Sequence, residues 1–289
     1  MNTHTIILAA GKGTRMNTNL PKVMQLLGGK SLIEHVINTA QEISNKVTVV
    51  VGHQKDFLKE HLAEIDPNIV TVNQENQHGT AHAVKTASHL IQDDEKVLIL
   101  YGDVPLISNN TIQSLLNSEN KCTLLSMTLS DPTGYGRVLS NEENLALKII
   151  EQKDASEDER KIKEVFTGIL LIDGDLLKPT LEEINNQNVA NEYYLTDLVE
   201  ILSTKGVKIN CIRANPLEVL GANNKHELQE LESILRKMSA EKLLDQGVTL
   251  LDKTRIDVRG KVTAGKDCTI DVNVILEGDV TLGDNVSIK

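Results

Sequence analysis

The chain has 289 residues, of which 40% are hydrophobic, enough for one large domain with its own core and a smaller one. Its 30 Lys and Arg residues against 41 Asp and Glu residues give a net charge of −11. A field of this sign repels nucleic acid and anionic membranes, so we expect neither as a partner. The three cysteines have no metal-knuckle spacing. Without a signal peptide or a bilayer-length apolar run, we expect a cytoplasmic protein.

Apolar runs of strand length alternate with longer stretches of helical period, a pattern typical of an α/β domain with a mostly parallel sheet. Seven runs predict strands, at residues 5–10, 47–51, 69–72, 97–100, 123–128, 166–172 and 207–212. The first four runs show no polar–apolar alternation, which predicts strands that are buried on both faces.

Helices are expected from about residue 31 to residue 44, near 196–204 and over 227–244. Ser31 is the predicted N-cap of the first helix, and Glu34 is placed to reach back to the Ser31 amide. The charged run over 154–164 predicts a solvated helix or loop, because mixed charges cannot line a core.

Beyond Gly247, apolar residues recur every six positions in two columns. One column is Ile256, Val262, Cys268, Val274, Val280 and Val286, and the other is Val258, Ala264, Ile270, Leu276, Leu282 and Ile288. Ordinary hairpins would not keep two columns in phase over six units, so we interpret the repeat as the first coils of a left-handed parallel β-helix. Gly265 and Gly283 follow second-column residues, where we expect corners with positive φ.

The loop after the first strand combines glycines with basic side chains, namely Gly11, Gly13, Arg15 and Lys22. Ligands gather at the carboxyl ends of parallel strands, and glycines allow backbone amides to approach phosphate oxygens. The loop therefore predicts a phosphate site, although its spacing matches neither GxGxxG nor the P-loop. The alternative is a tight turn with incidental basic residues.

A second candidate site follows the strand at 97–100, where Asp103 comes directly after a glycine. A carboxylate in this place suits Mg²⁺, a hard cation that takes one or two carboxylates and keeps phosphate oxygens in its shell. The alternative is that Asp103 caps the next helix or turn. In the loop at 74–82, Gln74 and Gly79 are candidates for contacts with a base, whereas His78 and His82 lack the HExxH zinc pattern.

Seven motifs in this order resemble those of one family. They are LAAGKGTRM at 8–16, GTAHA at 79–83, YGDVPLI at 101–107, DPTGYGR at 131–137, EQKDAS at 151–156, NEYYLTD at 191–197 and GANN at 221–224. Followed by hexapeptide repeats, they make the whole chain resemble the bifunctional N-acetylglucosamine-1-phosphate uridylyltransferase and glucosamine-1-phosphate acetyltransferase family. The resemblance implies a Rossmann-like nucleotidyltransferase domain at 1–227, a linker helix at 228–250 and a truncated β-helix at 251–289.

The resemblance also implies the site residues. The substrate-binding set would be Leu8, Ala9, Ala10, Gly11, Lys22, Gln74, Gly79, Thr80, Tyr101, Gly102, Asp103, Gly136, Glu151, Thr167 and Asn223. Within this set Gln74 and Gly79 would lie nearest the uracil, and Gly136, Glu151 and Thr167 would face the sugar. Arg15 and Lys22 would be the catalytic pair that neutralises phosphate charge.

Asp103 and Asn223 would bind the Mg²⁺ cofactor. The chain departs from the family at Phe166, where the family motif NTGI has an amide that contacts the sugar. The aromatic ring cannot replace that hydrogen bond, so this position bears on sugar affinity and identity.

The implied reaction converts UTP and N-acetylglucosamine 1-phosphate to UDP-N-acetylglucosamine and pyrophosphate, for peptidoglycan and lipopolysaccharide precursors. Such a transfer depends on positioning and charge neutralisation, and an anionic nucleophile requires no general base. With at most about two coils of β-helix, we expect no acetyltransferase activity and a weakened form of the family's homotrimer. Two alternatives stay open: a pyrophosphorylase for another sugar 1-phosphate or nucleotide, and a catalytically silent β-helix scaffold.

Overall fold

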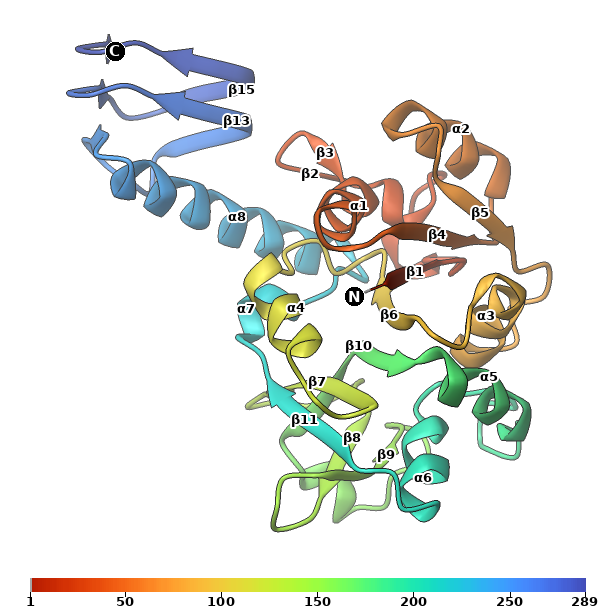
Figure 1. The fold of residues 1–289 in the computed structure, drawn as a ribbon. Helices are drawn as coiled ribbons and strands as arrows, with labels where there is room; N and C mark the ends of the chain where they lie inside the picture. Colours follow the sequence, from red (N-terminus) through yellow and green to blue (C-terminus); the bar gives the residue numbers. More distant parts are fainter. Residues whose placement is uncertain (1) are drawn as a thin grey trace.

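The computed structural model describes residues 2–289, and its larger part is built on a nine-stranded mixed sheet (Figure 1). The strand order is β11-β7-β10-β6-β1-β4-β5, and a hairpin of β8 and β9 joins β10. The strands are β1 (Thr3–Ala9), β4 (Lys46–Val51), β5 (Val70–Asn73), β6 (Lys96–Tyr101), β7 (Cys122–Thr128), β8 (Arg137–Ser140), β9 (Ala146–Ile150), β10 (Glu164–Asp173) and β11 (Ile209–Arg213). Two further short strands, β2 (Leu26–Leu27) and β3 (Lys30–Ser31), form a separate hairpin.

Four of the six strand pairs along this order are parallel. β1 pairs in parallel with β4 and β6, β4 with β5, and β11 with β7. β10 runs antiparallel to both β6 and β7, and the pairs β10–β8 and β8–β9 are antiparallel as well. The expected α/β class with a mixed, mostly parallel sheet is thus confirmed.

Helices cover both faces of this sheet (Figure 1). They are α1 (Leu32–Ile43), α2 (Lys55–Ile65), α3 (Thr80–Thr86), α4 (Asn109–Leu116), α5 (Gly174–Glu183), α6 (Asp197–Thr204) and α7 (Pro216–Val219), with 3₁₀ turns at Thr14–Met16, Lys22–Met24, Ser88–Leu90 and Glu159–Lys161. Alternate β1 side chains enter two separate cores: Ile6 and Leu8 pack with α3, α5 and α6, whereas Ile7 and Ala9 pack with α1, α2 and α4. Two covered faces explain why this strand reads as a continuous apolar run.

All seven predicted strands are present, but one of them is not buried on both faces. β5 is the last strand of the sheet and Val70 is 36% exposed, so the expectation of full burial was wrong there. An edge position is decided by strand order, which a run of apolar residues does not encode. The β8–β9 hairpin was not predicted, and the residues directly before and after it, Gly136 and Glu151, line the cavity described below.

The start of α1 is capped as expected. The Ser31 hydroxyl accepts a hydrogen bond from the Glu34 amide at 3.2 Å. The second half of the predicted capping box is not formed, because the Glu34 carboxylate lies 2.9 Å from the Lys30 Nζ atom. The charged run at 154–164 contains a 3₁₀ turn and is largely exposed, as expected.

The C-terminal part begins with the long helix α8 (Lys225–Asp245), which carries a stack of short parallel strands away from the sheet (Figure 1). These strands are β12 (Thr249–Leu250), β13 (Ile256–Ala264), β14 (Thr269–Ile270), β15 (Val274–Leu282) and β16 (Ser287–Ile288). β13 pairs with β15 at an offset of 18 residues, for example Ile256 with Val274. Three hexads therefore separate stacked strands.

All twelve residues of the two predicted columns pack in one apolar cluster, and the left-handed parallel β-helix stays a prediction. The expected positive φ at Gly265 and Gly283 was wrong: within the repeat that conformation occurs at Gly260, Asp267, Asn273, Gly278 and Asn285. Gly265 is needed for another reason, because a Cβ atom there would lie 2.8 Å from the amide nitrogen of Asp284 in the next coil.

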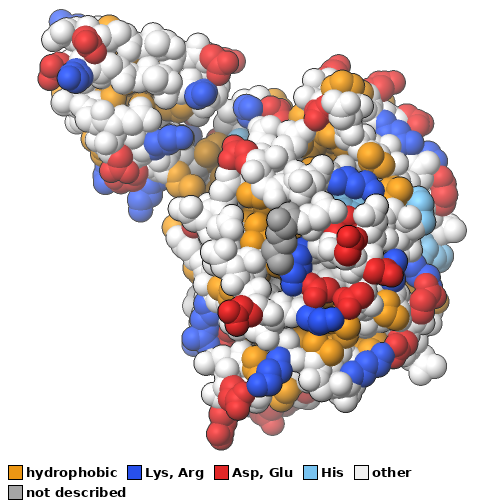
Figure 2. Space-filling view, viewed as in Figure 1, with side chains coloured by type: hydrophobic (Ala, Val, Ile, Leu, Met, Phe, Trp, Pro, Cys, Tyr) orange, Lys and Arg blue, Asp and Glu red, His pale blue; other side chains and the backbone are white. Residues whose placement is uncertain are grey.

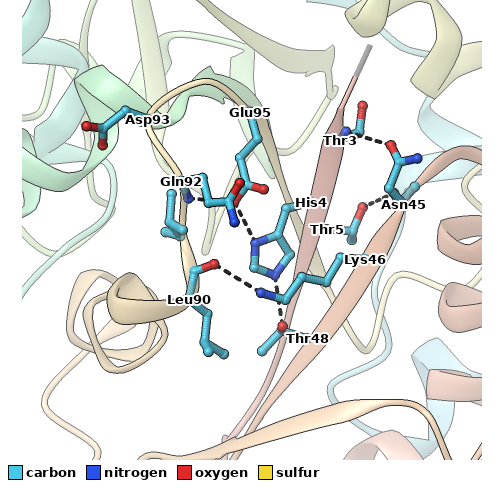
Figure 3. A network of polar contacts seen from close by, with 12 residues as sticks. Thr3, His4, Thr5, Asn45, Lys46, Thr48, Leu90, Gln92, Asp93 and Glu95 are labelled. Atoms are coloured by element: carbon cyan, nitrogen blue, oxygen red, sulfur yellow. Dashed lines mark hydrogen bonds and ion pairs between the residues drawn. The ribbon is translucent and has the colours of Figure 1, made fainter.

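A buried polar network lies at the amino end of β1 (Figure 3). The His4 ring, which is fully buried, contacts the Glu95 carboxylate through Nδ1 at 2.9 Å and the Thr48 hydroxyl through Nε2 at 2.8 Å. The Gln92 amide also donates to Glu95 at 2.9 Å. Burial lowers the pKa of His4 from its ordinary value, although Glu95 acts in the opposite direction.

Among the residues that the structure describes, no helix combines the length and apolar character needed to cross a membrane. α8 begins two residues before the expected domain boundary at 227, and the division into three parts stays a prediction.

Candidate active site

A cavity of about 670 Å³ opens beyond the carboxyl ends of β1 and β6. Its walls come from the loop after β1, the loop that enters α3, the β8–β9–β10 side of the sheet, and the segments that precede α6 and α8. On the face seen in Figure 2, acidic and basic side chains are interspersed over the larger part of the molecule. This face therefore shows no surface patch of one sign.

Nearly all residues that the sequence nominated line this cavity. They are Leu8, Ala9, Ala10, Gly11, Arg15, Lys22, Gln74, Gly79, Thr80, Tyr101, Asp103, Gly136, Glu151, Thr167 and Asn223. Gly102 does not line it: a Cβ atom at this position would meet a Val23 methyl carbon at 3.2 Å, so the glycine permits close packing beneath the site.

Charged and amide groups converge at one end of the cavity. The Lys22 ammonium is paired with the Asp103 carboxylate and donates to the Asn223 Oδ1 atom at 2.8 Å. Arg15 donates from Nη2 to the same Oδ1 atom at 2.9 Å. Lys22 and Asp103 have only 13% and 18% of their side-chain surface exposed. The structure thus joins residues that are up to 208 positions apart in the sequence.

Two oxygen atoms of this group suit a hard cation. Asp103 and Asn223 both direct an oxygen at the Lys22 ammonium. The two oxygens thus share one positively charged partner. The Asn223 amide nitrogen donates to Glu227 at 3.0 Å, which fixes its Oδ1 atom on the side of the cluster. Among the described residues, no group of three or more His, Cys, Asp or Glu side chains could hold a metal ion. A Mg²⁺ ion here would need further oxygens from a ligand, as is usual for this ion.

Another part of the cavity lining is a side-chain amide with a defined orientation. Gln74 is 3% exposed, and its Nε2 atom donates to the Gly79 carbonyl at 3.1 Å and lies 2.9 Å from His82 Nδ1. Burial and the neighbouring His78 lower the pKa of His82, which favours the neutral ring that accepts from Gln74. Because both amide hydrogens are used inside the protein, the Gln74 carbonyl oxygen is the atom that is left for a ligand.

The residue after Gly79 begins α3, and the loop before it is fixed by the segment 191–196. The Tyr193 amide donates to the His78 carbonyl at 2.7 Å, the Ala81 amide donates to the Tyr193 carbonyl at 2.9 Å, and the Leu195 amide donates to the Thr80 hydroxyl at 3.0 Å. Gly79 has φ 112° and ψ 177°, a conformation that is essentially restricted to glycine. These contacts place the backbone of 191–196 directly against the loop that holds Gln74 and Gly79.

A third group lies on the β8–β9–β10 side. Gly136 leaves room there, since a Cβ atom would lie 2.9 Å from Ile149 and 3.6 Å from the Glu151 carboxylate. Burial raises the pKa of Glu151, and a hydrogen bond from the Thr196 hydroxyl at 3.0 Å lowers it. Phe166 is 6% exposed and forms part of the cavity wall. This wall therefore presents a carboxylate beside an aromatic ring.

Sequence reasoning missed several residues of the cavity. Thr196 and Tyr194 line it, as does Glu227 near the start of α8. The motif at 191–197 was noticed only as part of the family resemblance, and no local pattern assigned its Thr or Tyr residues to a site. Their placement depends on the loop between α5 and α6 folding back over α3.

Comparison with known proteins gives related sequences and folds. Residues 5–166 match the MobA-like NTP transferase domain. Over 293 aligned residues the chain is 45% identical to the bifunctional protein GlmU of Idiomarina loihiensis, and it spans 64% of that protein's length. The resemblance expected from the motifs is thereby confirmed.

Solved structures show the same fold at low sequence identity. A UDP-glucose pyrophosphorylase complexed with UDP-glucose is 18% identical, with a TM-score of 0.68 over 82% of this chain and 100% of that one. The inositol-1-phosphate CTP transferase from T. maritima is 16% identical, with a TM-score of 0.66 over 82% of this chain and 96% of that one.

Proposed function

Because the chain belongs to the MobA-like NTP transferase family, we propose that it transfers a uridylyl group from UTP to N-acetylglucosamine 1-phosphate, forming UDP-N-acetylglucosamine and pyrophosphate. The observation that carries the proposal is the convergence of Arg15, Lys22, Asp103 and Asn223 at one end of the cavity. Identity of 45% to a bifunctional GlmU protein supports this choice of substrates.

The proposed reaction needs no covalent enzyme intermediate. A phosphate oxygen of the sugar 1-phosphate forms a bond to the α-phosphorus of UTP while the bond to the pyrophosphate leaving group breaks. The nucleophile is already an anion, so the protein has to orient the two substrates and offset their negative charge. Arg15 and Lys22 supply two positive charges at the cavity in a chain whose net charge is −11.

Asp103 and Asn223 would hold Mg²⁺, which would supply charge neutralisation at the phosphate oxygens. The protein groups around this position are already ordered. Glu227 orients Asn223, and the Asp103 carboxylate is partly buried next to Lys22. A site with prearranged charges reorganises little when the substrates bind, which is the main electrostatic contribution to such reactions.

Base selection is assigned to Gln74. Its free carbonyl oxygen can accept a hydrogen bond from the N3–H group of uracil, whereas the corresponding N3 atom of cytosine is itself an acceptor. The orientation of the Gln74 amide is fixed inside the protein, because its two amide hydrogens are donated to the Gly79 carbonyl and to His82. We therefore propose a uracil nucleotide in preference to a cytosine nucleotide.

Glu151, Gly136 and Thr167 are proposed to face the sugar. A second candidate substrate is favoured by Phe166, since an aromatic wall offers no hydrogen bond to a sugar amide or hydroxyl group. A different sugar 1-phosphate is the alternative to N-acetylglucosamine 1-phosphate, with the reaction class unchanged.

The test is a matrix of pyrophosphate release with UTP, CTP, dTTP and ATP against N-acetylglucosamine, glucose and galactosamine 1-phosphates, with Mg²⁺ or with chelator. We expect the highest kcat/KM for UTP with N-acetylglucosamine 1-phosphate and loss of turnover in chelator. Arg15→Ala should lower kcat/KM by about 100-fold or more. Preference for CTP would contradict the role of Gln74, and no release with any pair would contradict the proposed function.

A further inference from the structure

The Glu151 carboxylate is held by one side chain that no motif assigned to the site. Thr196 is 5% exposed, lines the same cavity, and donates its hydroxyl hydrogen to Glu151 Oε1 at 3.0 Å. Within residues 2–289, the structure shows no other side-chain hydrogen-bond donor to this carboxylate. A single hydrogen bond on one oxygen leaves the second oxygen available to a ligand.

The hydroxyl of Thr196 is not used to cap the helix that follows it. Thr196 precedes α6 with helical backbone angles, φ −61° and ψ −27°, and its side chain makes no capping hydrogen bond. A side-chain cap ordinarily requires a non-helical backbone at this position. The hydroxyl is therefore available for Glu151.

The backbone that carries Thr196 is itself fixed by the loop at residues 78–81. Tyr193 forms two backbone hydrogen bonds with His78 and Ala81, and the Leu195 amide donates to the Thr80 hydroxyl. One short segment therefore contacts the loop that carries Gly79 and, one residue later, the carboxylate of Glu151. It links the proposed base end of the site to the proposed sugar end.

We infer that Thr196 is a positioning residue that orients Glu151 toward the sugar of the sugar 1-phosphate. It also fixes the position of that carboxylate relative to the base loop, the loop that carries Gln74 and Gly79. The inference rests on the proposed function. The Thr196 hydroxyl bonds Glu151 and none of the four residues proposed to act on the phosphates, Arg15, Lys22, Asp103 and Asn223, so its removal should affect sugar binding more than UTP binding or turnover.

The test compares Thr196→Val, which keeps the shape and removes the hydroxyl, with Thr196→Ser, which keeps the hydroxyl. We expect Thr196→Val to raise the KM for N-acetylglucosamine 1-phosphate about tenfold or more, with the KM for UTP changed by less than about twofold. Thr196→Ser should restore the sugar KM to within about threefold of the wild-type value. Thr180→Val is the matched control, because Thr180 is equally buried and bonds only the Leu176 carbonyl within α5.

A double-mutant cycle with Glu151→Ala checks the route of the effect. If Thr196 acts through the carboxylate, Thr196→Val should change the sugar KM less than about twofold once the carboxylate is gone. Thr196→Ala replaces Thr196→Val in the same cycle if the valine variant does not fold.

The outcomes are separable. A wild-type protein without pyrophosphate release from any UTP and sugar 1-phosphate pair would overturn the proposed function and this inference with it. An active wild-type protein whose sugar KM is unchanged by Thr196→Val, or is raised equally by Thr180→Val, would overturn the inference alone. An equal rise in the KM values for sugar 1-phosphate and UTP would also overturn it, because that result indicates a general structural defect.

Discussion

Gly79→Ala tests whether the contact between the base loop and the segment 191–196 is as close as the structure shows. A Cβ atom at position 79 would lie 2.8 Å from the Tyr193 amide nitrogen and closer still to its carbonyl oxygen. Both neighbours are backbone atoms, so the strain cannot be relieved by a side-chain rotation. The segment would have to move away from the loop.

The expected cost has two parts. The backbone at φ 112° and ψ 177° is essentially a glycine conformation, and another residue there costs about 1–3 kcal/mol. Displacement of the segment would also break the two hydrogen bonds that Tyr193 makes with His78 and Ala81, at about 0.5–1.5 kcal/mol each. The sum predicts a loss of about 2–6 kcal/mol in the free energy of unfolding.

Gly206→Ala is the matched control. Gly206 also has positive φ, at 80°, but a Cβ atom there would have no described neighbour within 4 Å. This variant should cost only the left-handed backbone strain, about 1–2 kcal/mol. Urea unfolding followed by circular dichroism measures both values. If Gly79→Ala costs no more than Gly206→Ala, the close approach and the reasoning built on it are wrong.

Three further predictions concern charge, sugar and pH. Asp103→Asn should lower kcat by about 100-fold or more with an unchanged circular dichroism spectrum, whereas Asp94→Asn, at an exposed position outside the cavity lining, should have no effect; near-normal turnover of Asp103→Asn would exclude a metal-binding role. Phe166→Asn should lower the KM for N-acetylglucosamine 1-phosphate about two- to tenfold without altering the KM for UTP, and an unchanged sugar KM would show that the ring has no part in sugar recognition. Because burial lowers the folded-state pKa of His4 below 6.5, the unfolded chain binds more protons below that pH, and the free energy of unfolding should decrease as pH falls from about 7.5 to 5.5. His4→Gln should make this decrease smaller in urea titrations, and an identical pH dependence in the variant would refute the assignment.

The sequence alone determined the features that depend on local patterns. Continuous apolar runs indicated β1 and β6, because a strand covered on both faces has no polar side. The six-residue period indicated stacked parallel strands, because two apolar columns that stay in phase over six hexads must share one interior. The loop from Gly11 to Lys22 could be placed at a ligand site, since the carboxyl end of a parallel strand is where the sheet opens.

The family resemblance grouped Asn223 with Arg15 and Lys22 in one site, but no local pattern of the sequence showed which distant residues meet, and only the tertiary structure decided this. Asn223 reaches Arg15 and Lys22 across more than 200 positions, and Thr196 reaches Glu151 across 45. Neither pairing can be recognised from hydrophobic periodicity. The periodicity of apolar residues indicates which face of an element is buried, but it does not indicate which element packs against that face. The edge position of β5 was not predicted for the same reason. The assembly of this site is a property of strand order and of the loop that folds over α3, and both arise from long-range packing.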